Sequence, residues 1–156
     1  MKVISKRFGE LEVDQNAVIN FEEGLLGFNS AKQFVLLDVP ENPLFKWLQS
    51  VDSAEVTFLL VDPFVIKKDY SVKLDDTFLK ELEIENKEQV LIYTIVTIPA
   101  GGFINATTNL IGPLLINWQR KQGKQIVLED ENLHVRQPLF NPRNKPATSQ
   151  AAQCGG

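Results

Sequence analysis

Apolar residues along this chain fall in short runs that are separated by glycine, proline, asparagine or aspartate. Runs of this length that are rich in β-branched and aromatic residues are typical of strands. We predict a hairpin over 3–8 and 11–14, with Gly9 and Glu10 at its turn, and further strands over 17–21, 33–39, 45–50, 56–61, 90–98, 103–106, 114–118 and 124–128. Gly123 is read as a tight turn into the last of these strands. Many short strands with regular turn signals indicate a small barrel-like or sandwich domain of antiparallel strands.

Helical patterns are few in the sequence. Asp75 or Asp76 can cap a helix in which Phe78, Leu79 and Leu82 share one face. A turn of helix is also expected after the Asn29–Ser30 pair. The fold class predicted is therefore mainly β, with one or two short helices.

The chain divides into one domain and a tail. A length of 156 residues fits a single domain with a substantial core, which we place at residues 1–140. From residue 141 the sequence becomes polar and rich in Pro, Ala, Ser and Gln. Such a segment cannot bury enough apolar surface to offset the entropy of ordering, so 141–156 is predicted to be a flexible polar C-terminal tail.

The net charge and the cysteine content indicate which kind of partner the protein binds and in which cellular compartment it works. A net charge of −4 argues against direct binding to nucleic acid and suits a basic protein partner. The single cysteine, Cys154, cannot form an internal disulfide, which favours a reducing cytoplasm. The first residues hold no signal-peptide pattern, and the longest apolar run, 90–98, is about half a membrane span. We expect a cytoplasmic protein that does not enter a membrane.

The sequence contains few of the residues that usually form catalytic or metal-binding sites. One histidine and one cysteine cannot build a Cys/His zinc site or a Ser-His-Asp triad, and His134 is read as a surface or packing residue. Helix capping explains Asp75 and Asp76, and solvation explains the other acidic pairs. We therefore expect no enzyme activity, no cofactor and no metal. The alternative is a small β-barrel ligand-binding protein or enzyme that uses a cavity.

The segment 21–28 is the most unusual in the chain, because two glycines interrupt an apolar run and an acidic pair precedes it. Gly24 and Gly27 permit positive φ, so a compact turn is predicted. The segment serves either as an architectural corner or as a surface for another protein. If it is a surface, Glu22 and Glu23 form an acidic patch, and Leu25, Leu26 and Phe28 form an apolar protrusion next to it.

A second unusual segment, 108–117, joins a polar loop to a strand through a Gly-Pro pair. A structural loop is one reading, and a contact surface that includes Asn109, Pro113 and Asn117 is the other. Trp47 falls on one face of the predicted strand 45–50. It belongs to the core or, if partly exposed, anchors a partner.

Four blocks of the sequence, in order, resemble the FliW family of bacterial flagellar assembly factors. They are residues 19–28 with 34–37, then 45–50, then 58–63, and then 108–117. The resemblance covers about residues 1–140. One departure is Arg136-Gln137, with His134 two residues earlier, where the family often closes with an Arg-His pair.

The resemblance implies a non-enzymatic regulator. Members of the family bind the RNA-binding translational repressor CsrA and relieve its repression of flagellin mRNA, and they also bind flagellin. A partner switch governed by mass action follows, in a protein that is a monomer when free. A purely structural flagellar component is a rival reading. On this hypothesis the partner-binding residues are Glu22, Glu23, Leu25, Leu26, Phe28, Trp47, Asn109, Pro113 and Asn117.

Overall fold

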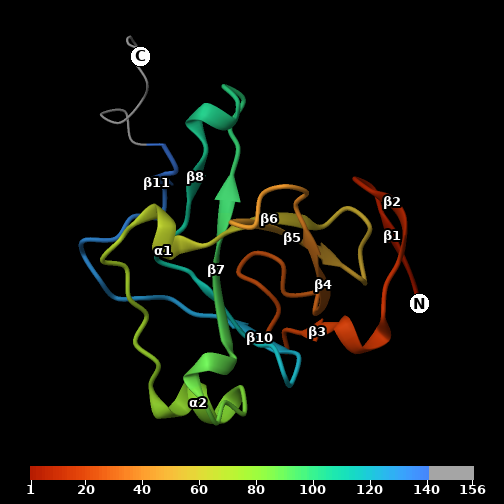
Figure 1. The fold of residues 1–156 in the computed structure, drawn as a ribbon, viewed down its shortest axis with the longest axis horizontal. Coiled ribbons are helices and arrows are strands. Elements are labelled where there is room, and N and C mark those ends of the chain that lie inside the picture. Colours follow the sequence, from red (N-terminus) through yellow and green to blue (C-terminus); the bar gives the residue numbers. More distant parts are fainter. Residues whose placement is uncertain (141–156) are drawn as a thin grey trace.

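The computed structural model describes residues 1–140, so the predicted tail 141–156 with Cys154 lies outside the described residues. The described part is mainly β (Figure 1). Its strands are β1 (Lys2–Ser5), β2 (Gly9–Glu12), β3 (Ile19–Asn20), β4 (Gln33–Asp38), β5 (Phe45–Ser50), β6 (Thr57–Val61), β7 (Val90–Thr97), β8 (Thr107–Thr108), β9 (Leu114–Asn117), β10 (Gln122–Gln125) and β11 (Gln137–Pro138). Its helices are α1 (Pro63–Ile66) and α2 (Asp76–Glu81), with 3-10 turns η1 (Gln15–Ala17), η2 (Lys87–Gln89) and η3 (Phe103–Asn105).

Strand β7 closes the sheet into a barrel, because it pairs with β6 on one edge and with β9 on the other. The barrel order is β7-β6-β5-β4-β3-β10-β9, and it returns to β7 through pairs such as Leu91 with Ile116. These pairings are antiparallel apart from the short parallel contact of Gln122 with Asn20. The predicted mainly β, barrel-like fold is confirmed.

The main core fills the barrel, because alternate residues of each strand point inward. Phe21 and Phe34 meet edge to face inside it, with ring centroids 5.6 Å apart. The other buried members of this core are Ile19, Leu25, Ala31, Leu48, Leu60, Leu114 and Ile116. Apolar residues that face outward from the barrel strands are covered by α2 and by the segments that follow α1 and β10.

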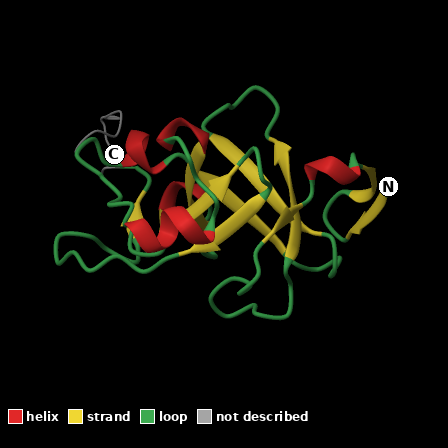
Figure 2. Cartoon of the chain, turned by 90° about the horizontal axis from the view of Figure 1, so that it is seen from below, coloured by secondary structure: helices red, strands yellow, loops and turns green. Residues whose placement is uncertain are grey.

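Three smaller cores lie beside the main one, and they are centred on Leu82, on Tyr70 and on Val61 with Val96 and Ala106. Helix α2 begins after Asp75, whose carboxylate accepts the Phe78 amide, and Leu82 packs with Leu115 of β9 and Ile126. Beyond α1, the Tyr70 hydroxyl donates to the Leu110 carbonyl at 2.7 Å. Figure 2 shows α1 and α2 on one side of the barrel, with the N-terminal hairpin on the other.

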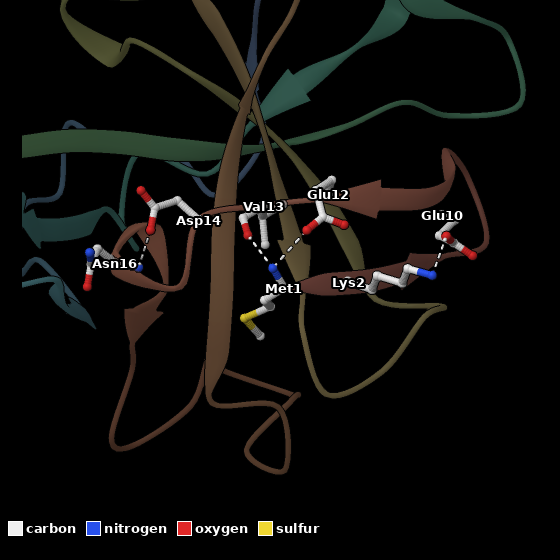
Figure 3. A network of polar contacts seen from close by, with 7 residues as sticks. All are labelled: Met1, Lys2, Glu10, Glu12, Val13, Asp14 and Asn16. Carbon is white, nitrogen blue, oxygen red and sulfur yellow. Dashed lines mark hydrogen bonds and ion pairs between the residues drawn. The ribbon is translucent and has the colours of Figure 1, made fainter.

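The N-terminal hairpin β1–β2 is fastened at both of its ends. The Met1 ammonium donates to the Glu12 carboxylate and to the Val13 carbonyl, both at 3.0 Å (Figure 3). At the turn, the Ser5 hydroxyl donates to the buried Gln49 side chain of β5 at 2.7 Å. The hairpin is therefore clamped to the barrel wall through a buried polar pair.

Several boundaries differ from the sequence-based predictions. The hairpin turns at 6–8 and not at Gly9-Glu10, because the Ser5 hydroxyl accepts the amides of Arg7 and Phe8. No helical turn forms after Asn29–Ser30, and 103–106 is the 3-10 turn η3 instead of a strand. The strand ending at Val61 is followed by α1, which is capped by the Asp62 carboxylate.

Gly123 does not make the turn that the sequence suggested. It lies inside β10, and the turn before that strand uses Lys121 at a φ of 54°. A Cβ on Gly123 would lie 2.5 Å from the Cζ of the buried Phe21 ring. The glycine is required because an aromatic ring packs directly on its backbone.

Candidate functional site

The glycine corner, residues 21–28, is a compact double turn at the barrel. The Gly24 amide donates to the Phe21 carbonyl, and the Phe28 amide donates to the Leu25 carbonyl, both at 2.8 Å. Gly24 has a φ of 67° and Gly27 a φ of 84°, values that glycine adopts without steric cost. A Cβ on Gly24 would also lie 2.6 Å from the Cα of Asn29. The compact turn predicted for this segment is confirmed.

The apolar side chains of the corner point in two directions. Leu25 is only 2% exposed and belongs to the barrel core, so its side chain is closed to a partner and the predicted contact role is corrected. Leu26 is 61% exposed and Phe28 is 45% exposed. Phe28 rests edge-on against Phe58, with ring centroids 5.1 Å apart. Two of the three predicted apolar contacts are therefore accessible.

The two carboxylates of the corner differ in their surroundings. Glu23 forms an ion pair with Lys124 at 2.8 Å, and Lys124 also pairs with Glu81 of α2. The hydrogen bond that the Lys124 ammonium donates to Glu23, followed by the one that it donates to Glu81, raises the pKa of Lys124. Glu22 is exposed and has no ion pair within residues 1–140. Glu23 thus links the corner to α2, and Glu22 offers its charge to solvent.

The corner is also fastened to the barrel through its backbone. The Leu26 amide donates to the side-chain carbonyl of Gln125 in β10, at 2.9 Å. The backbone under the two exposed apolar side chains is therefore held by glycine geometry and by a bond to a strand 99 positions away. A rigid backbone loses little conformational freedom when a partner covers it.

The residues predicted in the 108–117 segment are structural. The Asn109 side-chain oxygen accepts the amides of Ile111 and Gly112, at 3.0 and 3.1 Å. Pro113 is buried. Asn117 is fully buried, and its amide donates to the carbonyl of Leu82 at 2.7 Å. The Asn109 and Asn117 side chains satisfy backbone groups of neighbouring loops. Because Pro113 and Asn117 are buried, the prediction that these two contact a partner directly is wrong, and contact through the half-buried Asn109 stays a prediction.

Trp47 lies on the outer wall of the barrel, under the N-terminal hairpin. Its ring meets Phe8 edge to face with centroids 5.5 Å apart, and the Arg7 guanidinium lies 4.6 Å from the ring centroid. The side chain is half-buried. Trp47 therefore packs against the hairpin turn. Its strand partners are Leu37 and Leu59, so it is not a neighbour of the glycine corner in sequence or in strand pairing.

A groove of about 770 Å³ at the mouth of the barrel was missed by the sequence analysis. Its floor is apolar, from Leu36, Leu91 and Tyr93, and Trp118 stands at its side. No single segment signals it, because the lining comes from β4, β5, β7 and two separate turns. Only the inward alternation of Leu36, Leu91 and Tyr93 in their strands could have suggested a shared wall.

The groove has limited chemical capability. Burial raises the pKa of Tyr93, nearby Lys46 opposes that shift, and Asp62 and Asp38 add to it. The Lys46 ammonium is paired with the Asp38 carboxylate. The lining contains neither histidine nor cysteine. Within residues 1–140, no three His, Cys, Asp or Glu side chains gather closely enough to hold a metal ion. The arrangement is suited to binding.

None of the helices in the described part of the chain combines the length and apolar content needed to cross a bilayer.

Comparison with known proteins places these features in context. Residues 2–139 match the family described as FliW protein. The flagellar assembly factor FliW of Moorella thermoacetica is 41% identical over 140 residues, which is 90% of this chain and 89% of the relative. That of Natranaerobius thermophilus is 37% identical over 147 residues, 94% of this chain and 97% of the relative. A crystal structure of a flagellar assembly factor FliW superposes with a TM-score of 0.81 at 35% identity, covering 90% of this chain and 98% of that one.

Proposed function

This chain belongs to the FliW family of flagellar assembly factors, and from that premise we propose that it is a cytoplasmic regulator which binds a CsrA-type translational repressor and flagellin in turn. Binding to the repressor relieves repression of flagellin translation. Free flagellin then occupies the factor and releases the repressor. The state of the switch follows mass action, because whichever partner is in excess holds the factor.

The observation that carries the proposal is the exposed face of the glycine corner. Leu26 and Phe28 present apolar surface on a backbone held by glycine geometry and by the Gln125 bond, and Glu22, which is exposed and has no ion pair within residues 1–140, belongs to the same corner. Interfaces commonly combine apolar anchors with a polar rim. The proposed contact set is therefore Glu22, Glu23, Leu26 and Phe28, with Trp47 as a secondary candidate.

The charge of the corner suits one of the two partners in particular. A repressor that binds RNA must present cationic surface to phosphates. Glu22 would attract such a surface during encounter, an effect that speeds association and weakens with added salt. The net charge of −4 acts in the same direction. The chain is proposed to leave RNA itself untouched.

Binding measured with purified repressor tests the apolar part of the surface. Leu26→Asp places a charge where the partner's apolar surface would sit, so affinity should fall at least roughly tenfold. Ile104→Asp is the matched control, since Ile104 is also an exposed apolar residue but lies in η3. Equal affinities for the two variants would remove the corner from the interface.

Association rates measured at several salt concentrations test the electrostatic part. Glu22→Lys should slow association with the repressor and flatten its dependence on ionic strength. Glu131→Lys makes the same charge change at an exposed site beyond β10 and should have a smaller effect. Indistinguishable salt dependences for wild type and Glu22→Lys would rule out steering by this residue.

Exchange of partners separates the regulator from a purely structural component. Purified flagellin added to the preformed complex should release the repressor in a concentration-dependent way. A structural component would instead form a stable assembly without exchange. Failure to bind either purified partner would overturn the proposed function.

A further inference from the structure

One edge of β4 is open next to the groove at the barrel mouth. Along its whole length β4 pairs with β5, from Phe34 opposite Ser50 to Asp38 opposite Lys46. On its other edge it meets β3 only at Phe34 and Gln33, because β3 is two residues long. The chain before β3 forms the 3-10 turn η1 in place of a continued strand.

The pairing pattern shows which backbone groups this open edge presents. The Gln33 carbonyl accepts from the Val51 amide, so Gln33 faces β5. Because residues of an antiparallel strand face alternate edges, the amides and carbonyls of Leu36 and Asp38 face away from β5. Ala17, which would stand opposite Leu36, turns back to the Asp14 carbonyl. Within residues 1–140, no hydrogen bond reaches the backbone of Leu36 or Asp38 on this edge.

The groove runs beside that edge and offers space for side chains. Leu36 itself, with Leu91 and Tyr93, forms its apolar floor. Across from β4, Trp118 is 44% exposed and carries the Lys121 ammonium 3.6 Å from its ring centroid. An added strand would therefore find backbone partners on one side and apolar surface beneath alternate side chains.

The charges around the groove select the chemistry of the occupant. Asp38 and Glu88 are exposed carboxylates in its lining, and Lys46 is the cation there. Lys46 is already paired with Asp38, and Glu88 forms no ion pair within the described residues. On the side of the groove that holds Asp38 and Glu88, a basic side chain of the occupant is favoured over an acidic one, while the Lys121 ammonium on Trp118 gives the opposite side no such preference.

We propose that an extended peptide segment of a partner protein adds a strand to β4 at residues 36–38, with alternate apolar side chains in the groove and a Lys or Arg beside Asp38 and Glu88. Main-chain hydrogen bonds supply affinity, and the groove supplies specificity. This site is separate from the glycine corner. It goes beyond the partner switch proposed above and does not depend on the identity of that switch's partners.

Amide exchange tests the premise and the binding together. The probe is a labelled eight-residue peptide in which threonine and valine alternate and one valine is replaced by lysine, so that the lysine lies on the same face of the strand as the remaining valines. In the free protein the Leu36 and Asp38 amides should exchange quickly while those of Val35 and Leu37 are protected, and the peptide should protect the first pair. Methylating the peptide nitrogens that face β4 should weaken binding by roughly three- to tenfold per lost bond, and methylating the others should not.

A pair of variants at one position isolates the backbone donor. Asp38→Pro removes the amide that faces the groove, and β4–β5 pairing survives because that amide does not take part in it. Asp38→Asn removes the same carboxylate and keeps the amide. Peptide affinity should be about three- to tenfold lower for Asp38→Pro than for Asp38→Asn. Equal affinities for the two variants, protected Leu36 and Asp38 amides in the free protein, or no binding at about 1 mM peptide would each overturn the proposal.

Discussion

Replacing Gly24 with alanine tests how strongly the glycine corner contributes to the fold. Gly24 has a φ of 67°, where an L-residue with a side chain is strained by about 1–2 kcal/mol. The added Cβ would lie 2.6 Å from the Cα of Asn29 and 2.9 Å from its carbonyl oxygen. These are backbone atoms, so no rotamer change relieves the clash, and overpacking costs about 1–3 kcal/mol more. We expect Gly24→Ala to lower the free energy of unfolding by about 2–5 kcal/mol.

Gly27→Ala is the matched control, because it carries the strain without the clash. Gly27 has a φ of 84°, and nothing lies within 4 Å of the Cβ position. We expect it to cost about 1–2 kcal/mol. Equilibrium urea unfolding, followed by the fluorescence of the two tryptophans, measures both variants, and equal slopes would show that the unfolded states are comparable. If Gly27→Ala loses as much stability as Gly24→Ala, the contact with Asn29 does not constrain the corner.

Three further predictions concern the interior. Gly123→Ala should cost about 1–3 kcal/mol in urea unfolding, because the new Cβ would overlap the buried Phe21 ring; a neutral effect would show that the ring can move aside. Asn117→Ala should cost about 1–3 kcal/mol in the same assay, because it leaves buried backbone groups unpaired, and an unchanged midpoint would contradict that role. Burial raises the pKa of Tyr70 above its ordinary value of 10.0. Above that pH the unfolded chain ionises the phenol while the folded chain keeps it neutral, so stability should fall as pH rises. Tyr70→Phe should flatten this fall between about pH 9 and about pH 11, and an unchanged slope would show that Tyr70 does not cause it.

The strands were predictable where local signals agree. The ranges of β4, β5 and β7 match the predicted runs to within a residue or two, because β-branched and aromatic residues are bounded there by proline, glycine or polar turns. The sequence also predicted α2 with Asp75 or Asp76 as its cap, and the structure selects Asp75. In these elements the secondary structure is determined by local interactions, namely strand propensity, turn residues and helix capping.

Long-range contacts explain the predictions that were wrong. Asn117 resembles a surface amide in sequence, and only the approach of Leu82, 35 positions away, makes it a buried donor. Gly123 resembles a turn residue, and only the Phe21 ring shows why a side chain is excluded. Closure of the barrel by β7 and β9, and the groove that results at its mouth, depend on pairings that no local pattern encodes.

The glycine corner combines both kinds of determinant, and this bears on why its sequence is so distinctive. Gly24 and Leu25 are explained by the fold, through positive φ and burial. Leu26 is 61% exposed, so folding accounts for little of its apolar character, whereas Phe28 is 45% exposed and its contact with Phe58 explains part of its own. A single exposed apolar residue is ordinary. Two of them in one corner with the exposed Glu22, on a backbone held by Gly24 and by the Gln125 bond, form the small surface that we propose as a partner site. Because little ordering remains to be done on binding, such a surface would lose less of its contact energy to conformational entropy than a flexible loop of the same composition.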